Sequence, residues 1–226
     1  MHSAEQLLAA LQHADSFFPA GGIAFSWGVE TLVSDGCIGS PEDLAESLSG
    51  QIEQRWNHLD RVFLAQAYRC SDDPRALSVL DQELEAMLLA RESREGSRRA
   101  GTSLLLVHEK IGTPGAAHYR ALVNNAQALG HLPIVQALVW KAVGMAQATV
   151  ESVAAYAMCV GMIGASLRLG VIGHLAGQRI MTDLRPRMAK MLEKPAPSIA
   201  QAQSFAPGAE IAMMRHEVQA SRLFAN

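Results

Sequence analysis

Apolar residues recur along this chain at the three- and four-residue spacing that is typical of amphipathic helices. Ser40 and Pro41 form a helix-start signal, and the apolar positions after them lie at four-residue steps: Leu44, Leu48, Ile52 and Trp56. Asp73 and Pro74 repeat this signal ahead of a second apolar face: Leu77, Leu80, Leu84 and Met87. The pattern therefore predicts helices that each bury one face.

The helical periodicity continues through the rest of the chain, whereas strand signals are weak. Ser3 and Gln6 have the spacing of a capping box ahead of a first helix. Alternation of apolar and polar residues does not persist, and no Asn-Gly or Asp-Gly hairpin turn occurs. Further apolar helical runs lie near residues 98–111, 116–129, 134–149, 152–169 and 175–193. We therefore expect an all-α protein, a single-domain helical bundle of about ten helices with a C-terminal tail helix.

The character of the chain changes after Lys194. Two proline-containing stretches, 195–197 and 205–208, flank a polar, alanine-rich segment that cannot form one continuous helix. A last helix is predicted from about residue 209 to about 223, with a narrow apolar face at Ile211, Met214 and Val218. We expect a helical core domain at residues 1–194, followed by a linker and C-terminal tail helix at 195–226. Such a tail is either disordered alone or docked on another surface.

The segment at residues 15–30 is rich in aromatic residues, glycine and proline. Pro19 fixes one backbone angle and Gly21 and Gly22 permit positive φ, so we expect a defined bend. Four aromatic residues of the chain's twelve stand here: Phe17, Phe18, Phe25 and Trp27. On the residues alone, we favour a helix–turn–helix corner whose aromatic side chains fill the core. The helix after the bend is expected at residues 27–35 and should end at Gly36.

The composition is that of a globular protein. Of 226 residues, 49% are hydrophobic and 18% charged, which suffices for a core and is too apolar for disorder. The formal net charge of −3 gives no reason to expect nucleic acid binding. Three widely spaced cysteines without a CxxC pair favour a reducing compartment. The N-terminus lacks the basic and apolar regions of a signal peptide, so we expect a cytoplasmic protein.

One apolar segment, residues 153–167, has some character of a membrane span. It is shorter than the roughly 18–20 residues that a bilayer requires, and Arg168 closes it. Small residues recur every four positions at Ala157, Gly161 and Ala165, which lets a neighbouring helix approach closely. We therefore expect a buried central helix and no membrane association.

No constellation of residues points to catalysis. A phosphate-binding GxxxxGK[ST] loop is absent, and the glycines from 170 to 177 lie in helical sequence rather than after a strand. Ser26 stands in a motif one glycine short of a nucleophile elbow, with no strand before it. The eight histidines form no HxxxH, HExxH or Cys/His cluster. We predict no catalytic residue, no cofactor and no tight metal site, and a weak site shared between subunits stays open.

Residues 91–99 carry four arginines and two glutamates. Glu95 stands four residues from both Arg91 and Arg99, so pairs within one helix account for much of this charge. A solvated helix face is the simpler interpretation, because exposed ion pairs add little stability. A polar helix end that faces a partner is the alternative.

The segment at 15–30 also resembles a signature near the start of the urease accessory protein F (UreF) family, DSxxPxGxFxxSxGLE. Ile23 replaces the usual aromatic residue and Val29 the usual leucine. Seven positions match as they stand: Asp15, Ser16, Pro19, Gly21, Ser26, Gly28 and Glu30.

Further stretches resemble the same family in the correct order. They are the Arg/Glu/Ser-rich helix from residue 91, the His131-Leu-Pro-Ile-Val motif, the small-residue helix at 151–178, and the terminal segment 215–224. The terminal segment contains the family's His-Glu-x-x-x-Ser-Arg-Leu-Phe. Gln136 and Ala137 stand where a glycine is usual, and His174 replaces a common glutamine. Together these stretches identify the chain as a member of the family.

The resemblance implies a non-enzymatic maturation factor that forms an all-helical homodimer. It implies binding to the accessory protein UreD, called UreH in some organisms, and recruitment of the GTPase UreG. Through this complex nickel would reach the active site of the urease apoprotein. A water-filled passage for nickel and regulation of the GTPase are further roles that the resemblance implies.

The residues that the resemblance assigns to partner binding come from both ends of the chain and from the end of the apolar helix: Asp15, Ser16, Pro19, Glu30, Arg168, His216, Glu217, Arg222, Leu223 and Phe224. We expect the last three to anchor the tail against the UreD-type partner through apolar area and forked hydrogen bonds. Docking of the tail on its own chain is the alternative, and the two are compatible if the tail becomes ordered on binding.

Glu30 and Arg168 are expected on the surface that faces the GTPase. A buried arginine requires a partner, so a Glu30–Arg168 ion pair is the structural alternative. The alternative function is a regulator of the GTPase that inserts a cation at the nucleotide site, from Arg168 or from the helix at 91–99. An enzyme of unknown type has almost no support in the sequence.

Overall fold

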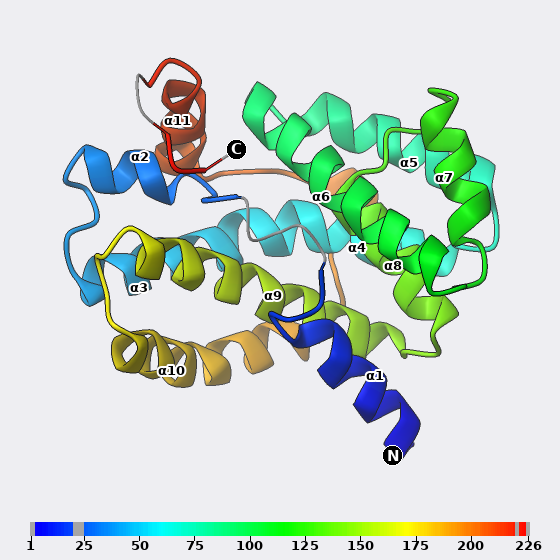
Figure 1. Ribbon diagram of the computed structural model, residues 1–226, viewed down its shortest axis with the longest axis horizontal. Helices are drawn as coiled ribbons and strands as arrows, with labels where there is room; N and C mark the ends of the chain where they lie inside the picture. Colours follow the sequence, from blue (N-terminus) through cyan, green and yellow to red (C-terminus); the bar gives the residue numbers. More distant parts are fainter. Residues whose placement is uncertain (1–2, 20–24, 220–221, 225–226) are drawn as a thin grey trace.

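The computed structural model describes residues 3–19, 25–219 and 222–224, and no β-strand is present among them (Figure 1). The predicted all-α, single-domain fold is therefore confirmed. The α-helices are α1 (Ala4–Ala14), α2 (Val29–Ser34), α3 (Pro41–Gly50), α4 (Arg61–Arg69), α5 (Pro74–Met87), α6 (Arg91–Lys110), α7 (Ala116–Asn124), α8 (Leu132–Ala142), α9 (Gln147–Arg168), α10 (His174–Leu192) and α11 (Pro207–His216). A π-helix, η2 (Gln51–Asp60), joins α3 to α4, and a short 3-10 helix, η3 (Ile199–Gln201), precedes α11.

The helix caps predicted at Ser3, Ser40 and Asp73 are confirmed. The Ser3 hydroxyl accepts a hydrogen bond from the Gln6 N–H, and the Ser40 hydroxyl accepts one from the Asp43 N–H, each at 3.2 Å. In both capping boxes the third residue of the helix also bonds back to the cap. Asp73 caps α5 by accepting from the Arg75 N–H at 2.9 Å.

The apolar stripe at four-residue steps lies on one continuous rod formed by α3, η2 and α4, and its members are buried as predicted: Leu44, Leu48, Ile52 and Trp56. The π geometry of the middle segment was not predicted. Hydrogen bonds from residue i to i+5 widen the helical turn, so side chains four residues apart stay closer to one face than in an α-helix. Ile52 and Trp56, the two stripe residues in this segment, are buried on the same side of the rod as Leu44 and Leu48 of α3.

Helix α8 lies at the centre of the core. Its residues 133–140 are all buried, and it packs against α4, α6 and α9. Helix α9 has 22 residues, so the expectation of a segment too short to span a bilayer was wrong. By length and composition alone α9 passes as a membrane span, but 61% of its most apolar window is buried inside the protein. Burial in the bundle explains its apolar character.

The bend predicted at Gly21 and Gly22 lies outside the described residues. Of the four aromatic side chains in this region, Phe25 is buried against Gly96, whereas Phe17 is 90% exposed. The expectation that all four fill the core was therefore wrong. Trp27 and Gly28 both have positive φ, so α2 begins at Val29 and not at Trp27 as predicted. Gly36, predicted to end this helix, does so with a φ of 73°.

Arg61 ties the end of α10 to the centre of the fold. Its fully buried guanidinium donates from Nε to Glu151 at 2.8 Å, and this ion pair satisfies its charge. It also donates to the backbone carbonyl groups of Met191 at 3.2 Å and Lys194 at 2.6 Å. A cation at the C-terminus of a helix satisfies carbonyl groups that lack helical partners. Arg61 thereby fixes the point where the linker leaves the core.

A buried carboxylate fixes the turn that leads into α8. Asp81 of α5 accepts the backbone N–H groups of Leu129, Gly130 and His131 at 2.7, 2.5 and 2.8 Å. The Tyr119 hydroxyl donates to it at 3.0 Å. Because these donors are buried or partly buried, they require acceptors inside the protein. The His131 motif noted in the sequence is thus part of a turn whose backbone is held in place by hydrogen bonds to Asp81.

Gly101 of α6 touches the same turn. A Cβ atom at this position would lie 2.1 Å from the Gly130 carbonyl oxygen and 2.9 Å from backbone atoms of His131 and Leu132. The neighbours are backbone atoms, so they cannot rotate away. The close packing of α6 against α8 therefore requires glycine here.

Replacing Gly101 with alanine is expected to lower the free energy of unfolding by about 3 kcal/mol or more, because the added carbon overpacks the core against rigid backbone. Denaturant unfolding followed by circular dichroism measures this change. Gly164→Ala is the matched control, since a Cβ added there would meet no neighbouring atom within 4 Å, and it should stabilise by up to about 1 kcal/mol. Equal stability of the two variants would contradict the packing of α6 on α8.

Candidate protein-interaction site

The C-terminal tail docks on its own chain, with α11 packed against α2 and α6 (Figure 1). The predicted apolar positions Ile211, Met214 and Val218 do not pack on the core, because all three are exposed, Val218 by 85%. The buried face consists of other residues: Ala209, Ala212, Met213 and His216. Two of these are alanines, which allow the backbone of α11 to approach α2 closely.

Gly28 is the position that α11 approaches. Its φ of 82° is left-handed, and a Cβ atom here would lie 3.1 Å from the Ala209 carbonyl oxygen. The same atom would lie 3.4 Å from the Met213 side chain. Gly28 thus combines a backbone conformation that favours glycine with a contact surface in which a side chain would fit only tightly.

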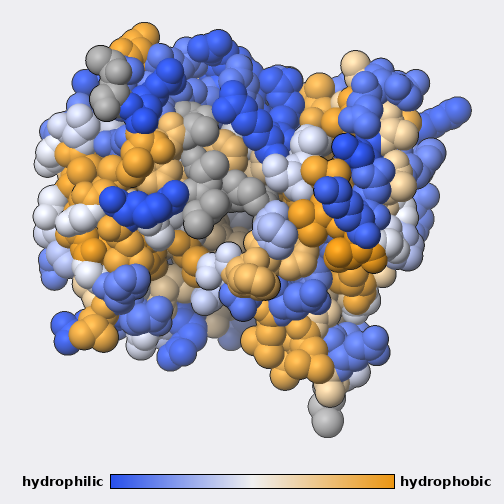
Figure 2. Space-filling model, in the orientation of Figure 1, coloured by the Kyte–Doolittle hydropathy of each residue, from blue (hydrophilic) through white to orange (hydrophobic). Residues whose placement is uncertain are grey.

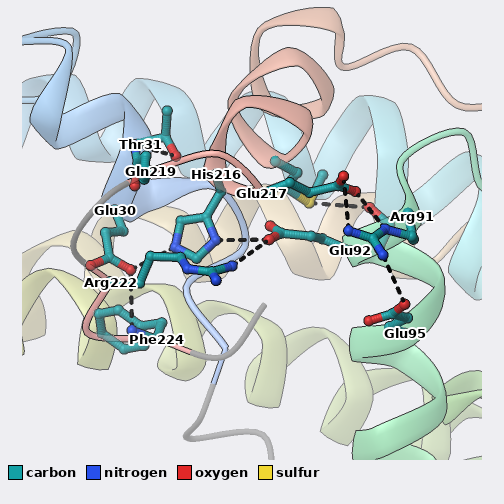
Figure 3. Close-up of polar contacts among 12 residues, drawn as sticks. Glu30, Thr31, Arg91, Glu92, Glu95, His216, Glu217, Gln219, Arg222 and Phe224 are labelled. Carbon is teal, nitrogen blue, oxygen red and sulfur yellow. Dashed lines mark hydrogen bonds and ion pairs between the residues drawn. The ribbon is translucent and has the colours of Figure 1, made fainter.

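His216 is fully buried at the end of α11, between two carboxylates (Figure 3). Its Nε2 lies 2.9 Å from Glu30 of α2, and its Nδ1 lies 3.0 Å from Glu92 of α6. Burial lowers the pKa of His216, but the hydrogen bonds and charges of Glu92 and Glu30 outweigh it and raise the pKa above its usual range. One imidazole therefore joins three elements that are distant in sequence.

Glu30 also receives the end of the chain. Its carboxylate accepts the backbone N–H of Leu223 at 2.6 Å and of Phe224 at 3.2 Å. The predicted last helix, 209–223, was therefore too long, since the helix ends at His216 and the last N–H groups bond to Glu30. A side-chain acceptor from α2 replaces helical carbonyl groups there.

Phe224 is buried, and the Arg168 guanidinium lies 4.2 Å from the centre of its ring. This is the geometry of a cation–π contact. Arg168 also donates from Nε to the Gly164 carbonyl oxygen at 3.2 Å. Glu30 and Arg168, which both lie among the described residues, do not form an ion pair with each other. The alternative of a Glu30–Arg168 ion pair was therefore wrong. Each residue instead holds a different part of the tail.

Exposed ion pairs surround the docked tail. Arg91 donates to both Glu217 oxygens at 3.1 Å, and Arg215 pairs with Asp35 of the segment after α2. The predicted pairs of Glu95 with Arg91 and Arg99 are also present, at 3.9 and 3.0 Å. Burial raises the pKa of Glu92, and its hydrogen bond to His216 acts in the opposite direction. The arginine-rich start of α6 is therefore partly a solvated face and partly a contact to the tail.

Within the described part of the chain, the opening-motif residues Asp15, Ser16 and Pro19 do not join the tail contacts. They line a cavity of about 270 Å³ among α1, η2, α8 and α9, which Arg168 also lines. Other lining groups are the buried Arg55–Asp60 ion pair at 3.0 Å, the Gln136 amide and His13. Burial lowers the pKa of His13, whose Nδ1 donates to the Ala9 carbonyl oxygen at 2.7 Å. Arg168 is thus shared between the cavity and the tail.

The sequence reasoning missed Glu92. Its position in the first turn of α6 is favourable for any acidic residue, so nothing local distinguishes it from an exposed glutamate. The contact with His216 spans 124 positions in the sequence. Within the described ranges, no group of three or more His, Cys, Asp or Glu side chains is arranged to hold a metal ion.

Comparison with known proteins relates this chain to one family. A family model named UreF matches residues 38–185. The urease accessory protein UreF of Actinobacillus pleuropneumoniae is 31% identical over 223 residues, which cover 97% of this chain and 98% of that protein. The UreF of Arthrobacter sp. (strain FB24) is 34% identical over 223 residues, 96% of each chain. The chain belongs to the UreF family.

The family match confirms the resemblance seen in the motifs. The UreF family model ends at residue 185, within α10, so it does not include the tail. The pairwise matches to individual UreF proteins cover 96–97% of the chain and therefore extend into most of the tail. The tail is thus part of the similarity to UreF proteins as well as part of the fold.

Replacing Gly28 with alanine is expected to loosen α11, because the new Cβ would press on the Ala209 carbonyl oxygen. Gly36→Ala is the matched control, since Gly36 also has positive φ but an added Cβ would meet no neighbouring atom within 4 Å. Both variants should lose about 1–2 kcal/mol through backbone strain. Only Gly28→Ala should accelerate hydrogen exchange of the α11 amides, and equal exchange in both variants would contradict this contact.

Proposed function

We propose that this chain is a urease accessory protein that acts as a non-enzymatic adaptor in assembly of the nickel metallocentre of urease. In this proposal it works in the cytoplasm as a homodimer, and bridges a UreD- or UreH-type accessory protein and the GTPase UreG. Nickel is the cargo of the complex, which delivers it to the urease apoprotein. Membership in the UreF family over nearly the whole chain supports the general role.

The observation that carries the adaptor proposal is the apolar outer face of the docked tail. Ile211 and Met214 are three residues apart on α11, and both are exposed. Val218 and Leu223 continue the exposed apolar residues beyond the helix. Neighbouring apolar side chains on one surface favour contact with another protein, whereas single exposed ones are common. We assign this surface to the UreD-type partner.

The two expected roles of the tail are divided between its residues. Phe224 is buried in its own chain under Arg168, so it supports docking on the core. Leu223 and Arg222 stay exposed beside it and offer apolar area and a forked donor. His216 and Glu217 hold the helix in place through Glu30, Glu92 and Arg91. The core contacts thus present the outer residues to a partner.

The GTPase-facing surface is the second part of the proposal. Arg168 lies at the exposed end of α9, next to the cavity lined by Asp15, Ser16 and Pro19. Glu30 is buried, so it would act on this surface by fixing the tail. The alternative function, regulation of the GTPase of UreG, predicts a change in GTP turnover when the chain is added. Unchanged turnover with impaired nickel loading in its absence would support the adaptor.

Helix α1 offers a surface for the homodimer. It packs on α9 and projects from the body, with the N-terminus at its outer end (Figure 1). Apolar side chains gather on this projection (Figure 2), and its exposed members are Leu7, Leu8 and Leu11. Residues three and four apart on a helix share one face, so these leucines form an apolar strip. A second copy of the chain would cover it.

Replacing Ile211 with aspartate should weaken binding of the UreD-type protein at least about tenfold, because a charge would enter an apolar contact. Surface plasmon resonance with the purified partner measures the affinity, and urease activity in cells measures the consequence. Val79→Asp is the control, since Val79 is equally exposed but lies on α5, away from the tail. Unchanged affinity for Ile211→Asp would refute the assignment of this surface.

Replacing Leu8 with glutamate should convert the homodimer to a folded monomer, because the charge would be buried at the α1 contact. Light scattering after size exclusion measures the mass. Leu175→Glu, at another highly exposed leucine on α10, should leave the mass unchanged. A dimeric Leu8→Glu protein would exclude α1 as the dimer contact.

A further inference from the structure

The contacts of His216 constrain where protons lie. A neutral imidazole has one N–H donor and one unprotonated nitrogen. Here both ring nitrogens lie within 3.0 Å of carboxylate oxygens, from Glu30 on one side and Glu92 on the other. If the ring were neutral and both carboxylates ionised, one nitrogen lone pair would face an anion. The cluster of Glu30, His216 and Glu92 therefore needs one additional proton, on the ring or on a carboxyl group.

Because the cluster is buried, the absence of this proton would cost free energy. The His216 ring is fully buried, and both carboxyl groups are more than nine-tenths buried. Water cannot replace a lost hydrogen bond inside such a cluster, so an unpaired charge or lone-pair repulsion would weaken the contact directly. One Glu92 oxygen already lacks a hydrogen-bond partner, which adds to the need for a proton nearby.

We propose that the docked tail is a proton-dependent latch: uptake of one proton by the Glu30–His216–Glu92 cluster holds α11 and the chain end on the core, and loss of that proton releases them. Release would remove the side chains of Ala212, Met213 and Phe224 from their buried positions. It would also remove the scaffold for the outer apolar face. The inference concerns this chain alone and holds whether or not the proposed partners are correct.

Other charged groups lie around the cluster and influence how tightly it binds the proton, but they do not take up the proton themselves. Arg222 of the tail lies 3.7 Å from Glu92, and the Arg91–Glu217 pair lies beyond it (Figure 3). Arg168 of α9 approaches the cluster through the Phe224 ring. These arginines keep their charge across the physiological range. The titration in this range therefore belongs to His216 and Glu92.

The sign of the pH dependence follows from the direction of the pKa change. Docking raises the pKa of His216, and burial raises that of Glu92, so the docked state binds the proton more tightly than the released state. Stabilisation is complete below the pKa of the free imidazole, about 6.5, and is lost as pH rises through the pKa of the docked cluster. Between these two values, the constant for release increases tenfold for each pH unit.

Hydrogen exchange of the full-length chain between pH 6 and 9 tests the latch. After correction for intrinsic exchange rates, the opening constant of the α11 amides should rise tenfold per pH unit above about pH 6.5 and then level off. Amides of α8 in the same protein should show no such rise, since α8 lies in the core away from the cluster. A flat profile for α11 would overturn the proposal, whatever the variants do.

Glu92→Gln is the decisive variant. The glutamine amide can donate to Nδ1 while a neutral imidazole donates from Nε2 to Glu30, so no extra proton is required. The tail should then stay docked up to pH 9, with an opening constant that no longer depends on pH. Glu95→Gln is the matched control on the same helix, because Glu95 pairs with Arg91 and Arg99 and should keep the wild-type profile.

The variants also separate the latch from a purely structural contact. A Glu92→Gln profile with the wild-type slope would overturn the proposal, and so would loss of the slope in Glu95→Gln. If Glu92→Gln fails to dock the tail at any pH, His216→Gln provides the second test. Its side chain does not titrate, so its α11 opening constant should be raised and independent of pH, and a remaining tenfold slope would refute the role of His216.

Discussion

The Glu30 carboxylate is the contact on which the C-terminal part of the structure depends. It accepts three hydrogen bonds, one from the His216 ring and two from the backbone of Leu223 and Phe224. A buried carboxylate without these donors would carry a large desolvation cost. The same donors would be unsatisfied without the carboxylate. Each side thus requires the other, and this requirement brings residues almost 200 positions apart into one site.

Glycine determines how closely the helices approach at two other points. At Gly101 the backbone of α6 touches the turn before α8, and at Gly28 the chain before α2 touches α11. The first contact lies within the core and the second beneath the tail. The available space differs, since an added carbon would lie 2.1 Å from a neighbour at Gly101 and 3.1 Å at Gly28. The core contact is therefore the less tolerant of the two.

The sequence predicted those features that depend on local chemistry. Capping residues, the buried stripe of the α3–η2–α4 rod and the helical class all follow from spacing and side-chain type. The buried face of α11 could not be predicted, because the apolar residues Ile211 and Met214 face outward, whereas Ala209, Ala212 and Met213 face Gly28. Likewise, Glu30 pairs with His216 and not with Arg168, because the docked tail places His216 next to Glu30. Motif similarity located many of the site residues but not Glu92, whose role arises only through the distant contact with His216.

The π-helix η2 sets the rotation of everything that follows it on the rod. Arg55 and Asp60, five residues apart, pair at 3.0 Å, although in an α-helix such residues would point roughly 140° away from each other. The wider turn therefore brings both charges to the wall of the cavity. It also fixes the direction of Arg61, the next residue along the rod, which holds the end of α10. Loss of one residue from this segment would turn the downstream helix by about 100° and separate the guanidinium from the carbonyl groups it now satisfies.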